Sequence, residues 1–284
     1  MRTFVARFSI LSNKPKNMSK LRILYVASEI NPFLQTCEVS DFVRKLPQAM
    51  QEKGMEIRIL VPRFGLINER KNRLHEVVRL SGINIAVGDE EKPLIIKVAS
   101  IPNAKLQVYF IDNEDYFHRK SVFHDKENKF YEDNDERAIF FCKGVIETVR
   151  KLGWGPDIVH CNDWITSFIP LYLKTTYKND PLFKATKTVF TIYNNSFSHK
   201  FKGDLMGKVK MMDIEDNMLG HLKTGDYEGF IKLGAQFSDI VSVAGDNKKL
   251  EGLVKKIKEK KIETIEKDDN YTESYYNLYN ELVG

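Results

Sequence analysis

The chain has 284 residues, 42% of them hydrophobic, which is enough for one large α/β domain or a domain with an appendage. Its net charge of +5 is spread over 44 basic and 39 acidic residues, so the balance demands no nucleic-acid partner. The three cysteines, Cys37, Cys142 and Cys161, are far apart and in no metal-ligand spacing, which predicts a reduced, cytoplasmic protein. No apolar run approaches ~20 residues, so no membrane span is expected.

The first 17 residues are basic with a short apolar middle, a pattern also found in weak signal or transit peptides. The apolar part is too short for that role, and no small-residue cleavage site follows it. Met18 begins a sequence typical of a cytoplasmic start. We therefore expect residues 1–17 to be a disordered extension.

The stretch Leu21–Gly54 begins with an apolar run rich in β-branched and aromatic residues, which predicts a buried strand. Apolar residues at helical spacing between Val39 and Met50 then predict a helix, and Gly54 stands where a helix C-cap is expected. The next strand is expected at Ile57–Val61. Strand, loop, helix and strand in this order are typical of a parallel sheet. Ligands lie at the carboxyl ends of such strands, so the loop Ser28–Glu38 is the first candidate site.

The middle of the chain predicts a hairpin, a strand, a surface loop and a long amphipathic helix. The hairpin would pair His75–Val87 with Leu94–Ile101, and the strand would be Leu106–Ile111. The loop would be Asp112–Lys129 and the helix Asp133–Leu152.

Strands and helices alternate in the second half of the chain, with short helices and loops over residues 196–226. The expected strands are Asp157–His160, Lys187–Ile192 and Ile240–Val243, and the expected helices are Trp164–Tyr177 and Tyr227–Phe237. The sum predicts an α/β fold with a doubly wound, mostly parallel sheet and one mixed edge.

After Gly245 the composition changes, which predicts a domain over residues 18–245 followed by a tail over residues 246–284. Apolar residues at helical spacing in the lysine-rich segment Asp246–Asp268 predict an amphipathic helix with a solvated face, in preference to a nucleic-acid patch. Tyr271–Val283 predicts a final helix whose tyrosines and leucines pack on the domain.

Four segments follow one another along the chain: LYVASEINPFLQTCEVSDFVRKLPQAM, FYEDNDERAIFF, GWGPDIVHCNDWITSFIPLYLK and KTVFTIYNNSF. Together they resemble the N-terminal domain of the ADP-glucose-dependent glycogen and starch synthases over roughly residues 20–245. The matching family patterns are the "SE-x-x-P" turn with the "KTGGL-x-D" loop, "Y-x-DN-x-x-RF", "HDWH" and "FT-x-HN". Four collinear matches make the resemblance specific.

The resemblance implies one N-terminal, acceptor-side half of a GT-B glycosyltransferase, in which two Rossmann-like domains hold a nucleotide-sugar between them. The reaction would transfer glucose from ADP-glucose to an α-1,4-glucan end with retention, without a metal or cofactor. The implied partners are the α-glucan and the sugar nucleotide. About 40 residues after Gly245 cannot form a second Rossmann-like domain, so we expect an uncovered cleft open to a partner chain or self-association.

The sequence departs from the family pattern at the phosphate loop and at the active-centre histidine. Gln35 stands at the position of the loop lysine, and Cys37 and Glu38 stand at the two glycines. Glu38 would favour the helix dipole and repel phosphate, so we expect a self-capped helix start in place of an anion site. Tyr193 stands at the position of the histidine.

By the resemblance, Asp163 is the candidate catalytic residue, with Tyr193 in the place of the family's histidine. The candidate substrate-binding residues are Gln35, Thr36, Asp41, Asn134, Arg137, Asn162, Trp164 and Asn194. Structural roles compete with each: an N-cap for Asp163, packing for Trp164, and capping and pairing for Asn134 and Arg137.

Two further residues have simple structural interpretations. Cys37 lies near a helix N-terminus, which lowers a thiol pKa, but no histidine or aspartate in its sequence context supports a nucleophile. His160 ends a buried strand, which is typical of a core histidine.

Three functions remain open from the sequence. The first is a glycogen/starch synthase-type glucosyltransferase domain that is impaired or inactive as an isolated chain. The second is a non-catalytic glucan-binding or regulatory module derived from such an enzyme. The third is a Rossmann-like protein with an unrelated ligand. The changes at Gln35–Glu38 and Tyr193 predict that the isolated chain does not transfer sugar.

Overall fold

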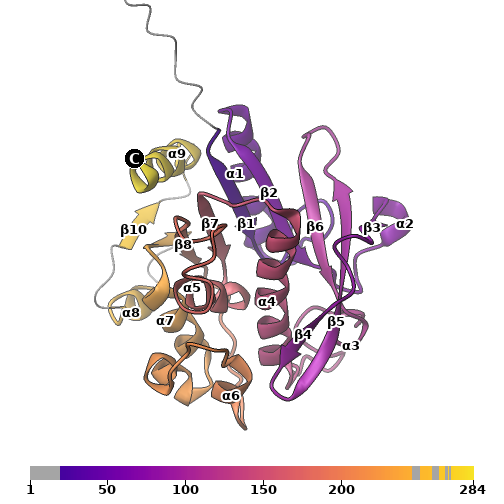
Figure 1. The fold of residues 1–284 in the computed structure, drawn as a ribbon, viewed down its shortest axis with the longest axis vertical. Coiled ribbons are helices and arrows are strands. Elements are labelled where there is room, and N and C mark those ends of the chain that lie inside the picture. Colours follow the sequence, from indigo (N-terminus) through magenta and orange to yellow (C-terminus); the bar gives the residue numbers. More distant parts are fainter. Residues whose placement is uncertain (1–19, 245–249, 258–261, 266–267, 269) are drawn as a thin grey trace, which may run out of the picture.

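The computed structural model describes residues 20–244, 250–257, 262–265, 268 and 270–284. These residues form a central sheet with helices packed on both of its faces (Figure 1). The predicted disordered extension over residues 1–17 lies outside the described residues. The predicted division into a domain over residues 18–245 and a tail stays a prediction.

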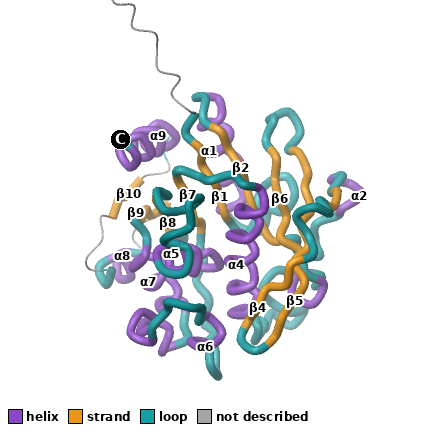
Figure 2. The backbone as a smooth tube through the Cα atoms, viewed as in Figure 1, coloured by secondary structure: helices purple, strands orange, loops and turns teal. Residues whose placement is uncertain are grey.

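The sheet has ten strands, in the order β10-β9-β8-β7-β1-β2-β6-β5-β3, with β4 paired to β5 alone (Figure 2). Their bounds are β1 Arg22–Val26, β2 Glu56–Pro62, β3 His75–Glu76, β4 Ile83–Val87, β5 Glu90–Ser100, β6 Gln107–Asp112, β7 Ile158–Asn162, β8 Lys187–Ile192, β9 Ile240–Ala244 and β10 Ile262–Ile265. The strands from β10 to β6 are parallel, and β5 and β3 are antiparallel. This arrangement confirms the mostly parallel sheet with one mixed edge.

The helices connect the parallel strands as expected for a doubly wound sheet (Figures 1 and 2). Their bounds are α1 Glu38–Glu52, α2 Glu69–Asn72, α3 Glu114–Phe117, α4 Asn134–Leu152, the 3₁₀ helix η1 Trp164–Thr166, α5 Phe168–Lys174, α6 Leu205–Val209, the 3₁₀ helix η2 Asp216–Thr224, α7 Tyr227–Phe237, α8 Glu251–Val254 and α9 Tyr271–Val283.

Helices α1 and α9 lie on one face of the sheet, and α4, α5 and α7 lie on the other. Phe42 of α1 packs against Tyr275 of α9 and against His160 of β7, so these two helices share one face. On the opposite face, α7 approaches β8 closely, because a Cβ atom at Gly234 would lie 2.8 Å from the Phe190 ring.

Helix α9 is joined to the sheet by a chain of buried hydrogen bonds. The Tyr279 hydroxyl accepts from the Tyr25 hydroxyl at 3.1 Å and hydrogen-bonds His160 Nδ1 at 2.6 Å. On its other side His160 bonds Thr191, and the Tyr275 hydroxyl donates to Ser242 at 3.0 Å. Burial lowers the pKa of His160 to about 3, so the imidazole is a neutral core group, as predicted.

Replacing Tyr279 with phenylalanine tests how much this network holds the fold together. The ring would stay packed while the hydroxyl is lost, leaving groups on Tyr25 and His160 buried without a partner. We expect a loss of about 1–3 kcal/mol in the free energy of unfolding, measured by urea denaturation. Tyr276→Phe on the half-buried side of the same helix is the matched control, and equal losses in both variants would contradict the network's role.

Four predicted elements differ from the structure. The strand expected at His75–Val87 is divided into β3 and β4, because the N–H groups of Leu80 and Ser81 turn back onto the Val77 carbonyl. The helix expected at Trp164–Tyr177 is divided into η1 and α5, with Pro170 in the first turn of α5, where a missing N–H does no harm. The loop expected at Asp112–Lys129 contains the short helix α3. The single lysine-rich helix expected over Asp246–Asp268 is wrong for the described residues, because β10 lies within it and pairs in parallel with β9.

Candidate functional site

Three loops meet at the carboxyl ends of β1, β7 and β8. The Asn195 side chain joins them, because its Nδ2 donates to Asp163 Oδ2 at 2.6 Å and lies 3.9 Å from Cys37 Sγ. Asn195 was not among the predicted site residues. Its signal in the sequence was its position next to Asn194, directly after a strand of the parallel sheet. The rule that ligands lie at the carboxyl ends of strands predicts a site at the edge where these loops meet, and that location stays a prediction.

The loop after β1 is organised around the buried carboxylate of Glu29, which is 2% exposed. It accepts hydrogen bonds from the backbone N–H groups of Thr36 and Cys37, at 3.0 and 2.7 Å, and from the Thr36 hydroxyl at 2.7 Å. These N–H groups precede the first turn of α1. Glu38 lies in the first turn of α1, as predicted, and the Glu29 carboxylate is a second negative group at the same helix start.

The remaining polar groups of this loop are also bonded to one another. Gln35 Nε2 donates to Asp41 Oδ2 at 3.1 Å, and Asn31 Nδ2 donates to Asp41 Oδ1 at 2.8 Å. Gln35 and Thr36 are exposed, and Asp41 is half-buried. These three predicted residues therefore lie together on one loop and the adjoining turn of α1.

Asp163 is fully buried and adopts a backbone conformation that glycine alone adopts readily, with φ 71° and ψ 167°. Such a conformation is destabilising by about 1–3 kcal/mol and is found mainly at functional sites. The carboxylate accepts from the Trp164 N–H at 2.8 Å, so the N-cap interaction is present alongside the contact with Asn195.

The protonation of Asp163 is shifted towards neutral pH. Burial raises its pKa to about 7, the hydrogen bonds from Trp164 and Asn195 oppose the shift, and the charges of Glu29 and Glu38 add to it. Near pH 7 the carboxyl group can therefore either donate or accept a proton, which is the property of a general acid or base.

Tyr193 and Asn162 form a buried pair beneath this edge of the sheet. The Tyr193 hydroxyl donates to Asn162 Oδ1 at 2.8 Å, and Asn162 Nδ2 donates to the Val26 carbonyl at 3.2 Å. Both side chains are at most 1% exposed. Asn194 is exposed at the rim of the same edge. The substrate-binding roles of Asn162 and Asn194 and the catalytic position of Tyr193 stay predictions. Of the three side chains, only that of Asn194 is exposed to solvent.

Arg137 and Asn134 lie on α4 beneath the surface. Arg137 donates to the carbonyls of Tyr116 and Val122, at 2.7 and 2.8 Å, and its guanidinium also bonds the Asn134 side chain. Burial lowers the pKa of Arg137 to about 9. Asn134 donates in turn to the Phe123 carbonyl at 2.9 Å. The structure gives both residues capping and pairing contacts, and neither side chain reaches solvent.

Trp164 is 1% exposed and lies in a cluster of aromatic rings. Its ring centroid is 4.9 Å from that of Phe123, 5.0 Å from Phe197 and 5.9 Å from Phe230. Trp164 therefore has the contacts of a packing residue. Because it directly follows Asp163, its packing in this cluster also holds the loop around Asp163 in place.

The Cys37 thiol is not activated as a nucleophile, because its surroundings disfavour the thiolate. Burial and the neighbouring carboxylates of Glu29 and Asp163 raise its pKa well above the usual value. The lowering of the thiol pKa expected from a helix N-terminus is outweighed, mainly because the thiol is buried and also because Glu29 places a negative charge beside it.

The candidate site is dominated by negative charge. Among the described residues, Glu29, Asp41 and Asp163 form no ion pair with a lysine or arginine within 4.0 Å. Carboxylates without cationic partners disfavour phosphate groups and are compatible with the hydroxyl groups of neutral sugars. The described residues also contain no group of three or more His, Cys, Asp or Glu placed to hold a metal ion.

Comparison with known proteins places the chain in a family. A family model described as the starch synthase catalytic domain matches residues 22–253. The chain belongs to the starch synthase catalytic domain family. Two curated relatives are the glycogen synthases of Chlorobium luteolum, 47% identical over 174 residues, and of Chlorobium limicola, 40% identical over 223 residues. These alignments cover 61% and 78% of this chain, but 36% and 45% of the two relatives, so the chain spans less than half of their length.

The fold agrees with the starch synthase family. The solved catalytic domain of starch synthase IV from Arabidopsis thaliana, bound to ADP and acarbose, superposes with a TM-score of 0.69 at 19% identity. The match covers 87% of this chain and 51% of that chain. The predicted fold class, a Rossmann-like half of a GT-B glycosyltransferase with a C-terminal helix, is therefore confirmed.

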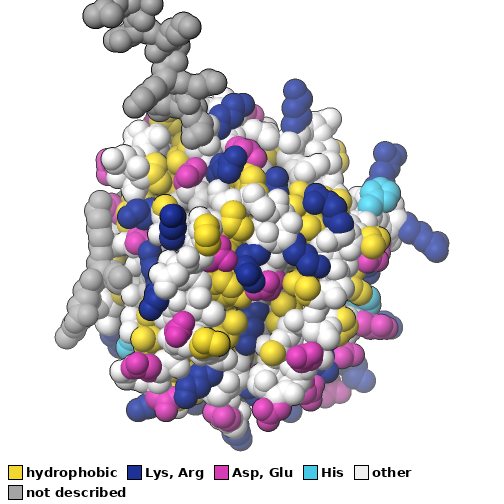
Figure 3. All heavy atoms as spheres, viewed as in Figure 1, with side chains coloured by type: hydrophobic (Ala, Val, Ile, Leu, Met, Phe, Trp, Pro, Cys, Tyr) yellow, Lys and Arg dark blue, Asp and Glu magenta, His cyan; other side chains and the backbone are white. Residues whose placement is uncertain are grey.

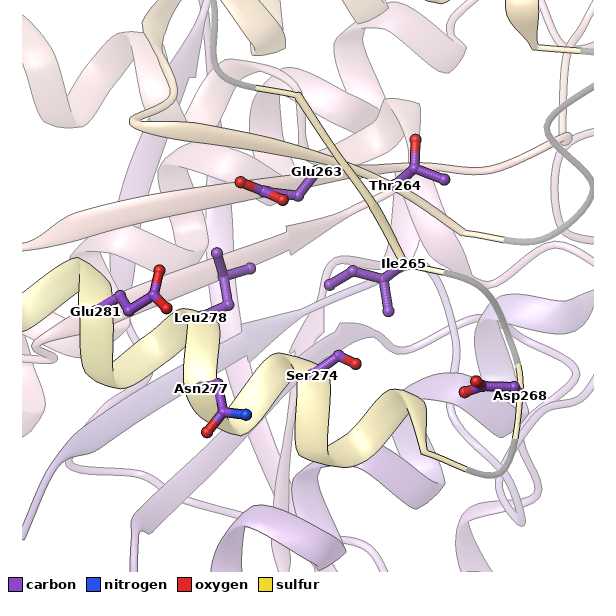
Figure 4. A pocket seen from close by; sticks show the side chains of 8 residues that line it. All are labelled: Glu263, Thr264, Ile265, Asp268, Ser274, Asn277, Leu278 and Glu281. Carbon is purple, nitrogen blue, oxygen red and sulfur yellow. The ribbon is translucent and has the colours of Figure 1, made fainter.

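A polar pocket of about 270 Å³ lies apart from the three loops, between β10 and α9 (Figure 4). Figure 4 shows Glu263 and Ile265 of β10 facing Leu278 and Glu281 of α9 across it. None of the predicted site residues of this starch synthase family member lines that pocket. In addition, no helix in the described part of the chain has the length and apolar character of a membrane span.

Proposed function

We propose that this member of the starch synthase family binds α-glucan at the carboxyl ends of β1, β7 and β8, and does not by itself transfer glucose from ADP-glucose. The observation that supports the proposal most directly is the position of Glu29. Its carboxylate occupies the backbone N–H groups of Thr36 and Cys37 at the start of α1. Those are the groups with which a helix N-terminus would hold a phosphate.

Electrostatics argues against a diphosphate at this loop. A phosphate charge about 4 Å from a carboxylate is opposed by roughly 4 kcal/mol at an effective dielectric constant near 20. Displacing Glu29 would in turn leave a buried carboxylate without hydrogen bonds. Gln35 supplies no positive charge and already donates to Asp41.

A neutral sugar carries no charge and is therefore not repelled by the carboxylates of this loop. Asn194 is exposed and Asn195 half-buried at the rim, and Gln35 and Thr36 are exposed beside them. Amide and hydroxyl groups of this kind can both donate to and accept from sugar hydroxyls. The curated relatives are glycogen synthases, and the Arabidopsis structure holds acarbose, so an α-glucan is the ligand class we assign.

Glucose transfer is the second candidate function, and one observation favours it. Asp163 has a pKa of about 7 in a backbone conformation typical of functional sites. A transferase role for this chain would require the donor phosphates to be held by other groups, for example those of a partner chain placed over this edge.

The experiment incubates the purified chain with labelled ADP-glucose and glycogen, and measures in parallel how much protein sediments with the glycogen. We expect retention on glycogen with no label incorporated above background. Incorporated label would contradict the absence of transfer, and lack of retention would contradict glucan binding.

A variant at Asn195 tests whether the glucan binds at the carboxyl ends of β1, β7 and β8. Asn195→Ala removes one rim amide, and because one hydrogen bond contributes about 0.5–1.5 kcal/mol, we expect roughly two- to tenfold weaker retention. Asn217→Ala, which removes an exposed amide from η2, is the matched control and should bind as the parent does. Equal retention of both variants would place the glucan elsewhere.

A further inference from the structure

A second pocket, of about 620 Å³, lies at the mixed edge of the sheet, where Phe33 of the loop after β1 forms part of its lining. Its floor is one face of the antiparallel strands. His75 of β3 is paired with Val98 of β5, and Ser100 of β5 is paired with Gln107 of β6. Residues directly opposite in an antiparallel pair, and residues two apart on one strand, point to the same side of a sheet. These four side chains therefore share one face.

The walls of the pocket have different characters. One wall is apolar, with Phe33, whose ring packs edge-on against Phe110 at 5.1 Å, and Pro102. The other wall is the end of α2 and the turn to β3, which contributes Lys71 and Arg73. A pocket with one apolar side and one polar side can hold a small ring compound in a fixed orientation.

The charges that line this pocket are all positive or titratable to positive: Lys71, Arg73 and His75. No carboxylate lines it. Within the described part of the chain, none of these three side chains has an ion-pair partner within 4.0 Å, whereas the nearby Glu69 is paired with Arg63 and Lys97. Glu69 is therefore already neutralised, and the three cationic groups are available to a ligand.

The surface view agrees with this charge distribution. Figure 3 shows dark blue Lys and Arg side chains and a cyan His side chain gathered over the part of the surface where Figure 1 places α2. The candidate glucan site has the opposite character, since carboxylates surround it. The two sites would thus select ligands of different charge.

We propose that this pocket binds a small sugar-sized phosphate monoester, with the phosphate between Lys71 and Arg73 and the ring over Phe33 and Pro102. Lysine and arginine are the usual partners of phosphate oxygens. The hydroxyl of Ser100 and the amide of Gln107 can bond ring hydroxyls on the floor. Phe33 lies on the loop that also carries Glu29, so a ligand here would contact the segment that shapes the glucan site.

The probe for this site is glucose 6-phosphate, titrated into the full chain by calorimetry at low ionic strength, with glucose and inorganic phosphate as separate probes. We expect glucose 6-phosphate to bind at least tenfold more tightly than either of the other two compounds, and more weakly as salt is added. No heat at millimolar glucose 6-phosphate, or equal affinity for inorganic phosphate, would overturn the proposal.

A double variant locates the binding. Lys71→Gln with Arg73→Asn removes two cationic groups, and asparagine suits the left-handed backbone of residue 73, where φ is 53°. We expect at least a tenfold loss of affinity for glucose 6-phosphate, with unchanged retention on glycogen. Lys178→Gln with Lys184→Gln, two exposed lysines between α5 and β8, gives the same change of net charge and should bind as the parent does. An equal loss of affinity in both double variants would mean that the effect comes from net charge alone, and it would contradict binding in this pocket.

Discussion

Replacing Trp164 with alanine is expected to lower the free energy of unfolding by about 3–5 kcal/mol. The indole is 1% exposed, and the substitution would leave its ring neighbours Phe123, Phe130 and Phe197 facing a cavity. The first two lie between α3 and α4, and Phe197 lies after β8. Urea denaturation followed by circular dichroism measures the loss, with the m-value reporting whether the transition stays two-state.

Comparing Trp164→Ala with Trp164→Phe distinguishes a packing role of Trp164 from a sugar-binding role. Trp164→Phe keeps an aromatic ring in the cluster and should lose less than half as much stability as the alanine variant. Glycogen retention, normalised to the folded fraction, should be unchanged in both. A stable alanine variant that no longer binds glycogen would show that the indole contacts the sugar.

Replacing Asp163 with asparagine is expected to stabilise the protein above pH 7 by up to about 4 kcal/mol, because a pKa unit corresponds to about 1.4 kcal/mol. Burial raises the pKa of Asp163 to about 7 in the folded state, from an ordinary value of 3.8. Above pH 7 the aspartate is charged in both states, so the folded state carries the full penalty of burying that charge. Asparagine has the same shape and no charge.

The pH dependence of this effect has a definite sign. As the pH falls from 7 towards 4, the folded parent binds a proton that the unfolded chain does not, so the parent gains stability and the advantage of asparagine disappears. Unfolding free energies of both proteins between pH 4 and pH 8 test this. His160 titrates in both proteins and cancels in the difference.

Asp89→Asn is the matched control for Asp163→Asn, since Asp89 is an exposed aspartate in a turn. It should leave stability unchanged at every pH. An advantage of Asp163→Asn that is the same at pH 4 and pH 8 would contradict the buried charge as its cause. A stabilising substitution at a buried polar residue is also typical of a site kept for function.

Most of the fold could be predicted because its strands are continuous apolar runs buried on both faces. The segments Ile57–Val61 and Lys187–Ile192 are strands close to their predicted bounds, since such runs depend little on distant residues. The strand β10 could not be predicted in this way. It has only four residues and lies in a lysine-rich segment whose apolar residues have helical spacing, and it becomes a strand through pairing with β9.

The edge of the sheet where the candidate residues meet could be predicted from the sequence, whereas most of their contacts could not. The sequence order of strands and loops placed Asp163 and Tyr193 at one edge of the sheet, because parallel strands end on the same side. That Glu29 turns back onto Thr36 depends on the path of the whole loop, and residue types alone do not give it. Likewise, the burial of Arg137 follows from the packing of α4 against the segment at Tyr116, which local sequence does not reveal.

The hydrogen bond between Tyr25 and Tyr279 joins residues 254 positions apart in the chain. During synthesis on the ribosome, Tyr25 and His160 leave the exit tunnel long before the hydroxyl that both of them contact. A nascent chain that ends before α9 therefore keeps these polar groups, and the face of the sheet around them, open to water. Native closure of this face is delayed during synthesis, because it waits for Tyr279, which is translated 119 positions after His160.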